Sequence, residues 1–308
     1  MTNGRWELLR ALGAIADTPA AARVPCGPLG LEPVSAAEHT TAFVLNCAPY
    51  ASVYLGPDGA LGGEGADRAA GFWRAAGLTP PAEPDHLSAL LSLYASLGEA
   101  AAQARLARTA SALSRAQAAL FHEHLASWLP GYLDAVASLR LPALSAWARL
   151  TQRALAAEHR ALPPADRLPL ALRAAPAPPG PDGPLIDLTG ALTTPVRSGL
   201  IITRHELSAG ARTAGVGYRI GERRFALRAM LEQDPAATLA WIAREAARWE
   251  RSHAARASAY PACRWWAGRA RTTARLARTA AFAAGGAACR PAGAPWSSRT
   301  SPATAARY

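Results

Sequence analysis

The stretch from residue 49 to residue 97 constrains the fold more than any other part of the chain. A glycine-rich loop at residues 56–65 is followed by a helix-forming run that stops at Gly77, before Pro80 and Pro81. Asp85 then follows Pro84 and precedes an apolar run, which predicts that Asp85 is the N-cap of a helix. The apolar side chains of that helix recur at helical spacing on one face: Leu87, Leu90, Leu91, Tyr94 and Leu97. The stretch therefore predicts a corner between two packed helical layers.

The rest of the chain also reads as helix. Ser35 with Glu38, and Thr203 with Glu206, fit the S/T-x-x-E capping box, and Asp234-Pro235 fits an N-cap followed by an N1 proline. Residues 1–33 show little pattern. After residue 97 we expect one long helix ending near residues 128–130, with this inward stripe: Leu106, Leu113, Leu120, Phe121 and Leu125. The strand-like segments LIDL and GLIIT are short and isolated. The prediction is an all-α, multi-helix bundle.

A proline-rich segment divides the chain. Residues 161–184 hold eight prolines in 24 positions, which neither a helix nor a central strand tolerates. The predicted organisation is an N-terminal segment (1–33), a helical domain (34–160), a proline-rich linker (161–197), a C-terminal helical part (198–260) and a basic, partly disordered tail (261–308). The sequence does not choose between a monomer and a homodimer, so both remain open.

Composition excludes several classes of chemistry. The chain of 308 residues has no lysine, and all 33 of its basic residues are arginine. A Walker A loop and Schiff-base catalysis both need a lysine, so both are excluded. The four cysteines lie far apart, which argues against a local zinc site. We see no signal peptide and no apolar run of about 18 residues, so we expect a cytoplasmic protein without a membrane span.

The positive charge is concentrated toward the C-terminus. Residues 1–160 have a net charge of −1, residues 161–308 have +12, and no acidic residue follows Arg251. One interpretation is a nucleic-acid-binding helical protein, with Trp265 and Trp266 as stacking surface beside these arginines: Arg264, Arg269, Arg271, Arg275 and Arg278. The plainer interpretation, which we favour, is a basic tail of a GC-rich coding sequence, so that a nucleic-acid partner is not expected.

The candidate catalytic and metal sites are weak. Asp85 and His86 are adjacent and point about 100° apart on a helix, so they do not converge on one metal. His122 and His124 lie two positions apart and also face different ways, whereas helical metal sites use i, i+4 spacing. No serine–histidine–aspartate set or carboxylate pair stands out. We therefore predict that the protein is not an enzyme and has neither a resident metal nor a cofactor.

A peptide-binding surface is the stronger interpretation of the corner. Tyr50, Tyr54, Phe72 and Trp73 offer apolar area, and five acidic residues lie among them: Asp58, Glu64, Asp67, Glu83 and Asp85. An apolar groove with an acidic rim suits a hydrophobic peptide that carries arginines. On composition alone, an ordinary solvated loop is an equal alternative.

The segment PYASVYLGPDGALGG and the tetrad Glu83-Pro84-Asp85-His86, followed by a leucine-rich helix and by FHEHLASW, resemble the TorD/DmsD-like family of molybdoenzyme maturation chaperones, which is related to nitrate reductase assembly proteins. The resemblance covers residues 35–135, and less specifically 198–253. It implies an all-helical, cytoplasmic, non-enzymatic chaperone whose partner is the twin-arginine leader and apo form of a molybdopterin oxidoreductase. With the residues around the corner added, the predicted peptide-binding set is Pro49, Tyr50, Ser52, Tyr54, Glu83, Pro84, Asp85 and His86.

Overall fold

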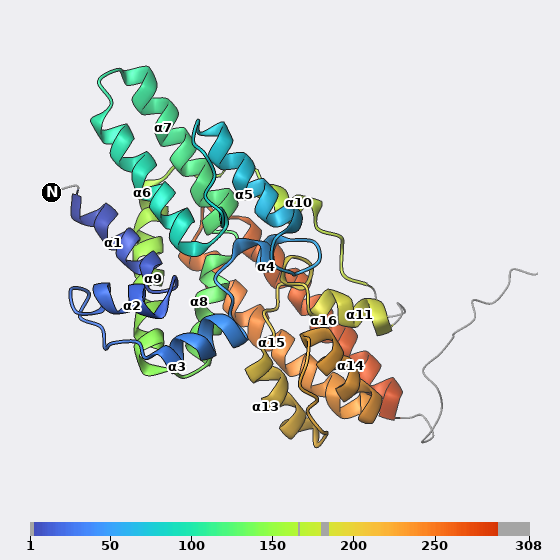
Figure 1. Cartoon of the computed structure of the whole chain (residues 1–308). Helices are drawn as coiled ribbons and strands as arrows, with labels where there is room; N and C mark the ends of the chain where they lie inside the picture. The colour runs from blue at the N-terminus through green and yellow to red at the C-terminus, as the bar shows by residue number, and fades with distance from the viewer. Residues whose placement is uncertain (1–2, 166, 180–184, 289–308) are drawn as a thin grey trace, which may run out of the picture.

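The computed structural model describes residues 3–165, 167–179 and 185–288, and the chain is helical in each of these ranges. Helices make up 72% of the model, and the described residues form no strand, only an isolated β-bridge between Tyr50 and His86. The predicted all-α class is confirmed (Figure 1). Among the described helices, none is at once long and apolar enough to cross a membrane.

The N-terminal segment is more ordered than its sequence suggested. It forms α1 (Asn3–Ala14) and α2 (Pro19–Cys26), so the absence of pattern read from residues 1–33 was wrong. Trp6, Leu9 and Leu12 are buried, and α1 packs on the later helices α6 and α9. The indole N–H of Trp147 donates to the carbonyl of Leu12 at 2.9 Å. Trp6, Leu9 and Leu12 are spaced at i, i+3 and i+6, a helical pattern from which α1 could have been predicted.

The helices that frame the corner come next. They are α3 (Ala36–His39), the π-helix η1 (Thr40–Asn46), α4 (Ala51–Leu55) and α5 (Gly63–Ala75). The capping box predicted for Ser35 and Glu38 is present at the start of α3. Helix α5 ends where Gly77 takes a φ of +77°, a conformation that glycine adopts without steric cost.

Helix α6 (Leu87–Gln103) carries the predicted apolar stripe, and all five residues of that stripe are buried. Because α6 extends to Gln103, the long helix expected after residue 97 begins only at Ala107. Helix α7 (Ala107–Leu120) packs beside α6, and Leu106, which was expected inside, lies in the connection between them and is 54% exposed. The chain continues through the π-helix η2 (Phe121–Leu125) into α8 (Leu129–Ser138) and α9 (Pro142–Ala161).

Short helices occupy the described part of the proline-rich region. They are α10 (Leu170–Ala174), α11 (Leu185–Leu192) and α12 (Pro195–Ser198). The segment LIDL, which had a weak strand pattern, lies in α11. Each helix is only four to eight residues long, as expected where prolines remove backbone donors and clash with the preceding turn.

The C-terminal part consists of α13 (Arg204–Ala214), α14 (Arg223–Gln233), α15 (Pro235–Ala259) and α16 (Trp265–Ala288). The caps predicted at Thr203 and Asp234 are both present. Within the segment assigned to a basic tail, α16 packs along α15 and buries Trp265 and Trp266. The predicted basic, partly disordered tail also includes residues 289–308, which lie outside the described ranges. One apolar core runs through the chain from Trp6 to Ala280.

Candidate functional site

Backbone pairing closes the corner between α4 and α6. The amide of Leu87 donates to the carbonyl of Pro49 at 2.8 Å, and the amide of Ala51 donates to the carbonyl of Asp85 at 3.0 Å. Between these two bonds lies the isolated β-bridge of Tyr50 and His86. Segments that are more than 30 residues apart in sequence are thus held side by side, and the predicted corner exists.

Asp85 stabilises this pairing from inside. Its side chain is buried, with the residue 3% exposed, and its Oδ2 accepts a hydrogen bond from the amide of Ser52 at 2.9 Å. Asp85 is therefore not the N-cap of α6, so the prediction made from the sequence was wrong. The N-cap is His86, whose Nδ1 accepts a hydrogen bond from the amide of Ser88 at 3.2 Å. The carboxylate instead serves an amide in the first turn of α4, where a negative charge is favourable.

Ser52 and Pro84 fix the neighbouring loop and helix. The hydroxyl of Ser52 accepts from the amide of Gly62 at 3.2 Å, and the carbonyl of Pro84 accepts from the indole of Trp73 at 3.1 Å. A Cβ at Gly65 would lie 2.7 Å from the Cα of Ser52, so only glycine allows α5 to approach α4 this closely. Ser52 and Pro84 are both buried, and their observed contacts support the corner itself.

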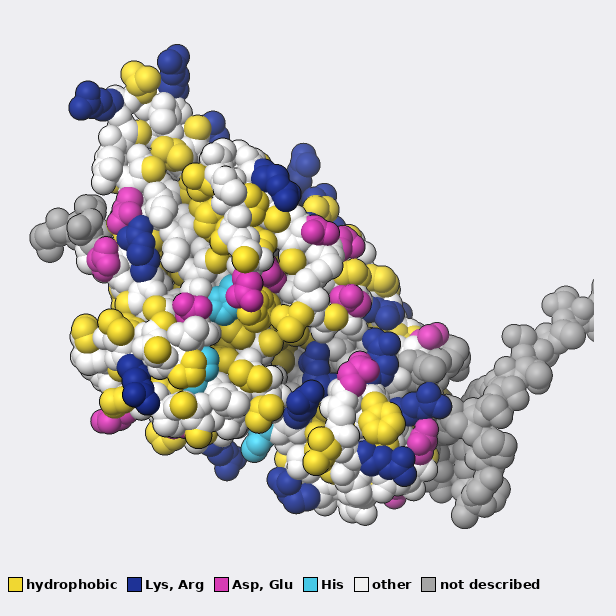
Figure 2. All heavy atoms as spheres, viewed as in Figure 1, with side chains coloured by type: hydrophobic (Ala, Val, Ile, Leu, Met, Phe, Trp, Pro, Cys, Tyr) yellow, Lys and Arg dark blue, Asp and Glu magenta, His cyan; other side chains and the backbone are white. Residues whose placement is uncertain are grey.

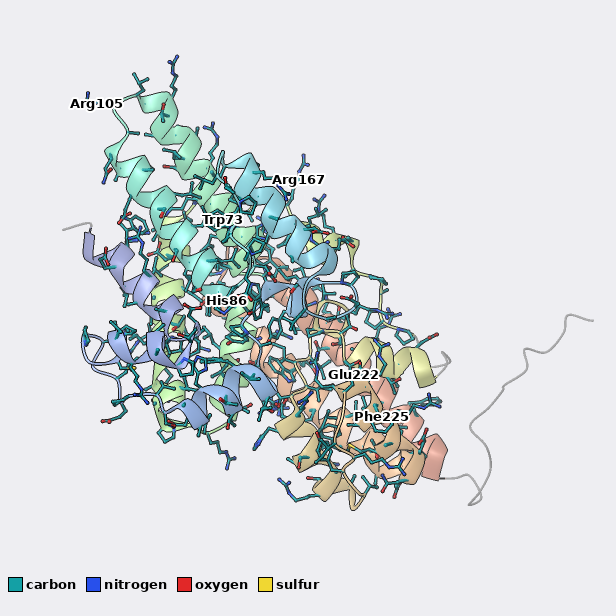
Figure 3. The ribbon with its side chains drawn as sticks, viewed as in Figure 1. Trp73, His86, Arg105, Arg167, Glu222 and Phe225 are labelled. Atoms are coloured by element: carbon teal, nitrogen blue, oxygen red, sulfur yellow. The ribbon has the colours of Figure 1, made fainter. Side chains whose placement is uncertain are left out.

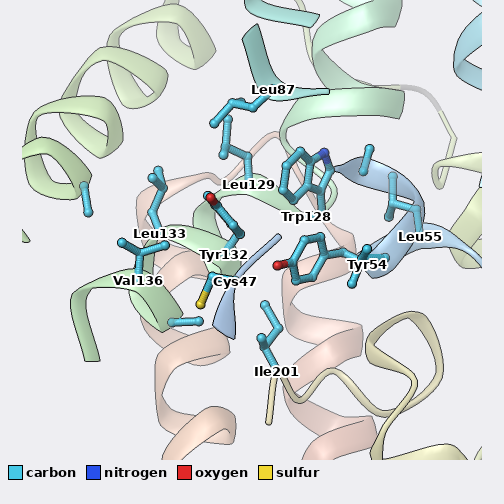
Figure 4. Packing of buried hydrophobic residues seen from close by; sticks show 14 of the residues in the cluster. Cys47, Tyr54, Leu55, Leu87, Trp128, Leu129, Tyr132, Leu133, Val136 and Ile201 are labelled. Carbon is cyan, nitrogen blue, oxygen red and sulfur yellow. The ribbon is translucent and has the colours of Figure 1, made fainter. Parts of the chain in front are cut away.

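Tyr54 faces away from the corner. Its ring stacks on Trp128 at a centroid distance of 5.0 Å, and Figure 4 shows the two rings side by side in the core. The hydroxyl of Tyr54 donates to the carbonyl of Ala48 at 2.9 Å. The structure therefore brings seven of the eight predicted residues to the corner, and Tyr54 contributes to the core beneath it.

The outer side of the corner is acidic and aromatic. Glu83 is exposed, Tyr50 is half-buried, and the Tyr50 ring meets His86 edge-on at 4.8 Å. Burial, together with hydrogen bonding to Glu83 and the charges of Glu83, Asp85 and Asp17, raises the pKa of Tyr50 to about 12. Sequence reasoning missed Asp17, which reaches this surface from the turn between α1 and α2. Figure 2 shows acidic side chains beside hydrophobic ones near the middle of this face, where Figure 3 labels His86.

Burial keeps His86 neutral at this surface. It lowers the pKa of the imidazole, and the nearby charges of Asp17, Glu83 and Asp85 only partly oppose this effect. The imidazole already caps α6 through Nδ1. The surface thus offers carboxylates and an aromatic edge, which suit binding of a cationic, apolar partner.

The other histidines have structural contacts. His122 Nε2 is 2.9 Å from the carbonyl oxygen of Pro163, whereas the ring of His124 meets Phe72. Cys263, which the sequence did not connect with histidines, lies 3.9 Å from His122 and 3.7 Å from His159, measured to Nδ1 of each. Burial raises the pKa of this thiol to about 12, so it is a poor nucleophile. No group of three or more histidine, cysteine or acidic residues in the described ranges is arranged to hold a metal ion.

The proposed stacking surface of the C-terminus lies inside the protein. Trp265 is 4% and Trp266 is 2% exposed, and Trp266 stacks on His253 at a centroid distance of 5.4 Å. Bases of a nucleic acid cannot stack on indoles that are already covered. That part of the nucleic-acid hypothesis is wrong, because Trp266 packs against His253 of α15 and Trp265 packs against His122.

Sequence comparison relates the part of this all-α chain that contains the corner to a known family. The family model described as nitrate reductase delta subunit matches residues 32–134, which contain α3 to α7 and the whole of the Pro49–His86 pairing. Residues 32–134 therefore belong to this family, and the resemblance read from the sequence is confirmed. It is a family of molybdoenzyme assembly chaperones, not of enzymes, which supports a chaperone role. No curated protein and no solved structure matches the chain.

Proposed function

We propose that this protein is a chaperone that binds the twin-arginine leader and the apo form of a molybdopterin oxidoreductase, and assists insertion of its cofactor before export. The observation that carries the proposal is the family match over residues 32–134, because that region includes the corner with Tyr50 and Glu83 of its outer surface. A leader peptide combines arginines with an apolar run, and the corner offers chemistry that is complementary to both.

We assign different tasks to the predicted binding residues. Tyr50 and Glu83, joined by Asp17, form the surface that contacts the leader. The arginines pair with the two carboxylates through charge-assisted hydrogen bonds, and the apolar part of the peptide packs on the ring of Tyr50. Pro49, Ser52, Pro84, Asp85 and His86 hold that surface in shape through the contacts described above.

The test is isothermal titration calorimetry of the full chain with a synthetic twin-arginine leader peptide. We expect the double variant Asp17→Asn/Glu83→Gln to bind at least about tenfold more weakly, since each lost charge-assisted bond is worth about 1.5–3 kcal/mol before solvent screening. The matched control is Glu232→Gln, an exposed carboxylate on α14 that pairs with Arg228 within its own helix. Unchanged affinity in the double variant, or an equal loss in the control, would remove the proposed surface.

A second peptide and the choice of variants help to interpret the titration. A leader in which both arginines are replaced by glutamine is expected to bind wild type as weakly as the double variant binds the natural leader. Asp85→Ala and His86→Ala are poor tests of contact, because both side chains are buried and stabilise the corner. Their loss of binding would follow from damage to the fold.

A further inference from the structure

A cavity of about 620 Å³ lies between α16, α12 and the segment 168–178, outside the region matched by the family model. Its lining includes six arginines: Arg197, Arg264, Arg269, Arg271, Arg275 and Arg278. No acidic residue is among the lining residues. We call this cavity the arginine groove.

The charges of the arginine groove are not compensated by the described protein. None of its six guanidiniums forms an ion pair with an acidic residue in the described ranges, although eight such pairs exist elsewhere in them. On α16, Arg271, Arg275 and Arg278 follow one another at i, i+4 and i+7, so they share one face and repel. All three are exposed. This arrangement favours an anion.

Two arginines are held rigidly at the inner side of the groove. Arg269 donates from its two terminal nitrogens to the carbonyls of Val196 at 2.6 Å and Pro195 at 2.7 Å, and Arg197 donates to the carbonyl of Ala177 at 3.4 Å. The Nε atoms of Arg197 and Arg269 are buried, with no hydrogen-bond partner among the described residues. Burial, and then repulsion by Arg256, lowers the pKa of Arg269 to about 10, so it stays cationic at neutral pH.

Apart from Thr272, the rest of the lining has no polar side chain. It comes from the proline-rich segment on one side and from the helices on the other: Leu168, Leu172, Pro176, Pro178, Val196 and Trp265. A ligand that fits must therefore combine anionic groups with an apolar or flat body. The volume lies in the range of small-molecule sites.

We propose that the arginine groove binds a small phosphate-bearing molecule, with Arg271, Arg275 and Arg278 contacting its phosphate oxygens. Guanidinium groups match phosphate oxygens in bidentate pairs, and a diphosphate concentrates enough negative charge to neutralise three neighbouring cations. A carboxylate-bearing peptide would bring single charges spaced along an extended chain, which suits a compact groove less well. The apolar lining receives the organic part of the ligand.

The experiment uses the full chain and inorganic pyrophosphate as the probe, in isothermal titration calorimetry at physiological salt. We expect binding at one site and at least a tenfold loss of affinity in Arg271→Gln/Arg275→Gln. The matched control is Arg244→Gln/Arg251→Gln, which removes the same charge from exposed positions of α15 that do not line the groove. Pyrophosphate is also expected to raise the thermal midpoint of wild type and of the control, but not of the groove variant.

Three results would overturn the proposal. The first is the absence of saturable pyrophosphate binding. The second is an equal loss of affinity in both double variants, which would mean attraction by overall charge alone. The third is binding of single-stranded DNA or an acidic peptide that the groove variant abolishes, while pyrophosphate neither binds nor competes. Circular dichroism of both variants is expected to match wild type, because all four substituted side chains are exposed.

Discussion

Asp85 belongs to a tetrad that resembles a binding motif, but its charged side chain supports the fold. Its carboxylate lies inside the protein and accepts the amide of Ser52, 33 residues away in sequence. The residue just before it in the tetrad, Pro84, accepts from Trp73, whereas Glu83 points to solvent. Adjacent residues of one tetrad therefore divide between internal support and outward chemistry.

Removal of the Asp85 carboxylate is expected to destabilise the fold. Asp85→Ala leaves the buried amide of Ser52 without its acceptor, which costs about 1–3 kcal/mol of unfolding free energy. The measurement is urea denaturation followed by circular dichroism. Glu83→Ala is the neighbouring control and is expected to change the unfolding free energy by less than about 0.5 kcal/mol. If the two variants unfold at the same urea concentration, Asp85 does not support the corner in this way.

At the level of helices, close approach depends on glycine at particular positions. Gly98 lies in α6 where α1 crosses, and a Cβ there would overlap Cη2 of Trp6 and Nε2 of Gln117. Gly71 lies in α5, and a Cβ there would meet no atom of a neighbour within 4 Å. The same substitution is therefore expected to have opposite effects in two helices of one protein.

Gly98→Ala is expected to destabilise the protein by about 1–3 kcal/mol, because overpacking forces Trp6 or the helix to move. Gly71→Ala is expected to stabilise it by about 0.5–1 kcal/mol, because alanine restricts the unfolded chain and favours helix. Thermal denaturation of both variants compares them directly. A loss of stability in both would indicate that the contact with Trp6 does not decide the sign.

Helix boundaries were predictable from sequence where their signals were local. The capping boxes at Ser35 and Thr203 and the cap at Asp234 were all found, because each uses residues within three positions. The role of Asp85 was missed, because its partner is distant in sequence. The break between α6 and α7 was predicted too early in the chain, since the alanine-rich sequence around residue 103 carries no proline or glycine to mark a turn.

Of the candidate site, the corner was predictable but its outer surface was only partly so. The spacing of prolines and the apolar stripe placed the two segments near each other. Which side chains turn outward depends on packing, and Asp17 joins from a segment in which no pattern was recognised. The arginine groove was likewise visible only as a concentration of charge, because its wall at residues 168–178 has no sequence signal that pairs it with α16.

At the scale of the whole molecule, one arginine ties the two helical parts together. Arg256 of α15 pairs with Asp134 of α8 and lies over the rings of Trp249 and Trp266, at 5.5 and 5.1 Å from their centroids. Burial lowers its pKa, while Asp134 opposes this effect. Because α16 supplies Trp266, a chain truncated after Tyr260 would expose the face of α15 that α16 covers, and it is unsuitable for testing the C-terminus alone.

The buried histidines predict sensitivity to mild acid. Burial lowers the pKa of six histidines: His39, His86, His122, His124, His159 and His253. The pKa falls to about 4 for His124 and to about 2 for His253. Their pKa in the unfolded chain is about 6.5, so below that pH the unfolded state binds protons that the native state does not. Stability is then lost as the pH falls, by about 1.4 kcal/mol per pH unit for each histidine that is charged only when unfolded.

We expect the urea midpoint to fall markedly between pH 7.5 and pH 5.5. Glu206 works in the opposite direction, since burial raises its pKa and its native form takes up a proton before the unfolded form does. Glu206 is one group against six histidines, and the ordinary pKa of a glutamate lies below the interval from pH 5.5 to pH 7.5. An unchanged midpoint between the two pH values would mean that the histidines are solvated and titrate normally in the native state.

The structural role of the Glu83–His86 tetrad matters when this tetrad is used to compare protein sequences. Three of its four residues are buried and support the pairing of α4 with α6, so the tetrad reports on that architecture and says little about what the protein binds. Under the proposed function, a preference for one client over another would depend on the exposed positions beside this pairing, where substitutions do not endanger folding. Residues 17 and 83 mark the places to compare first.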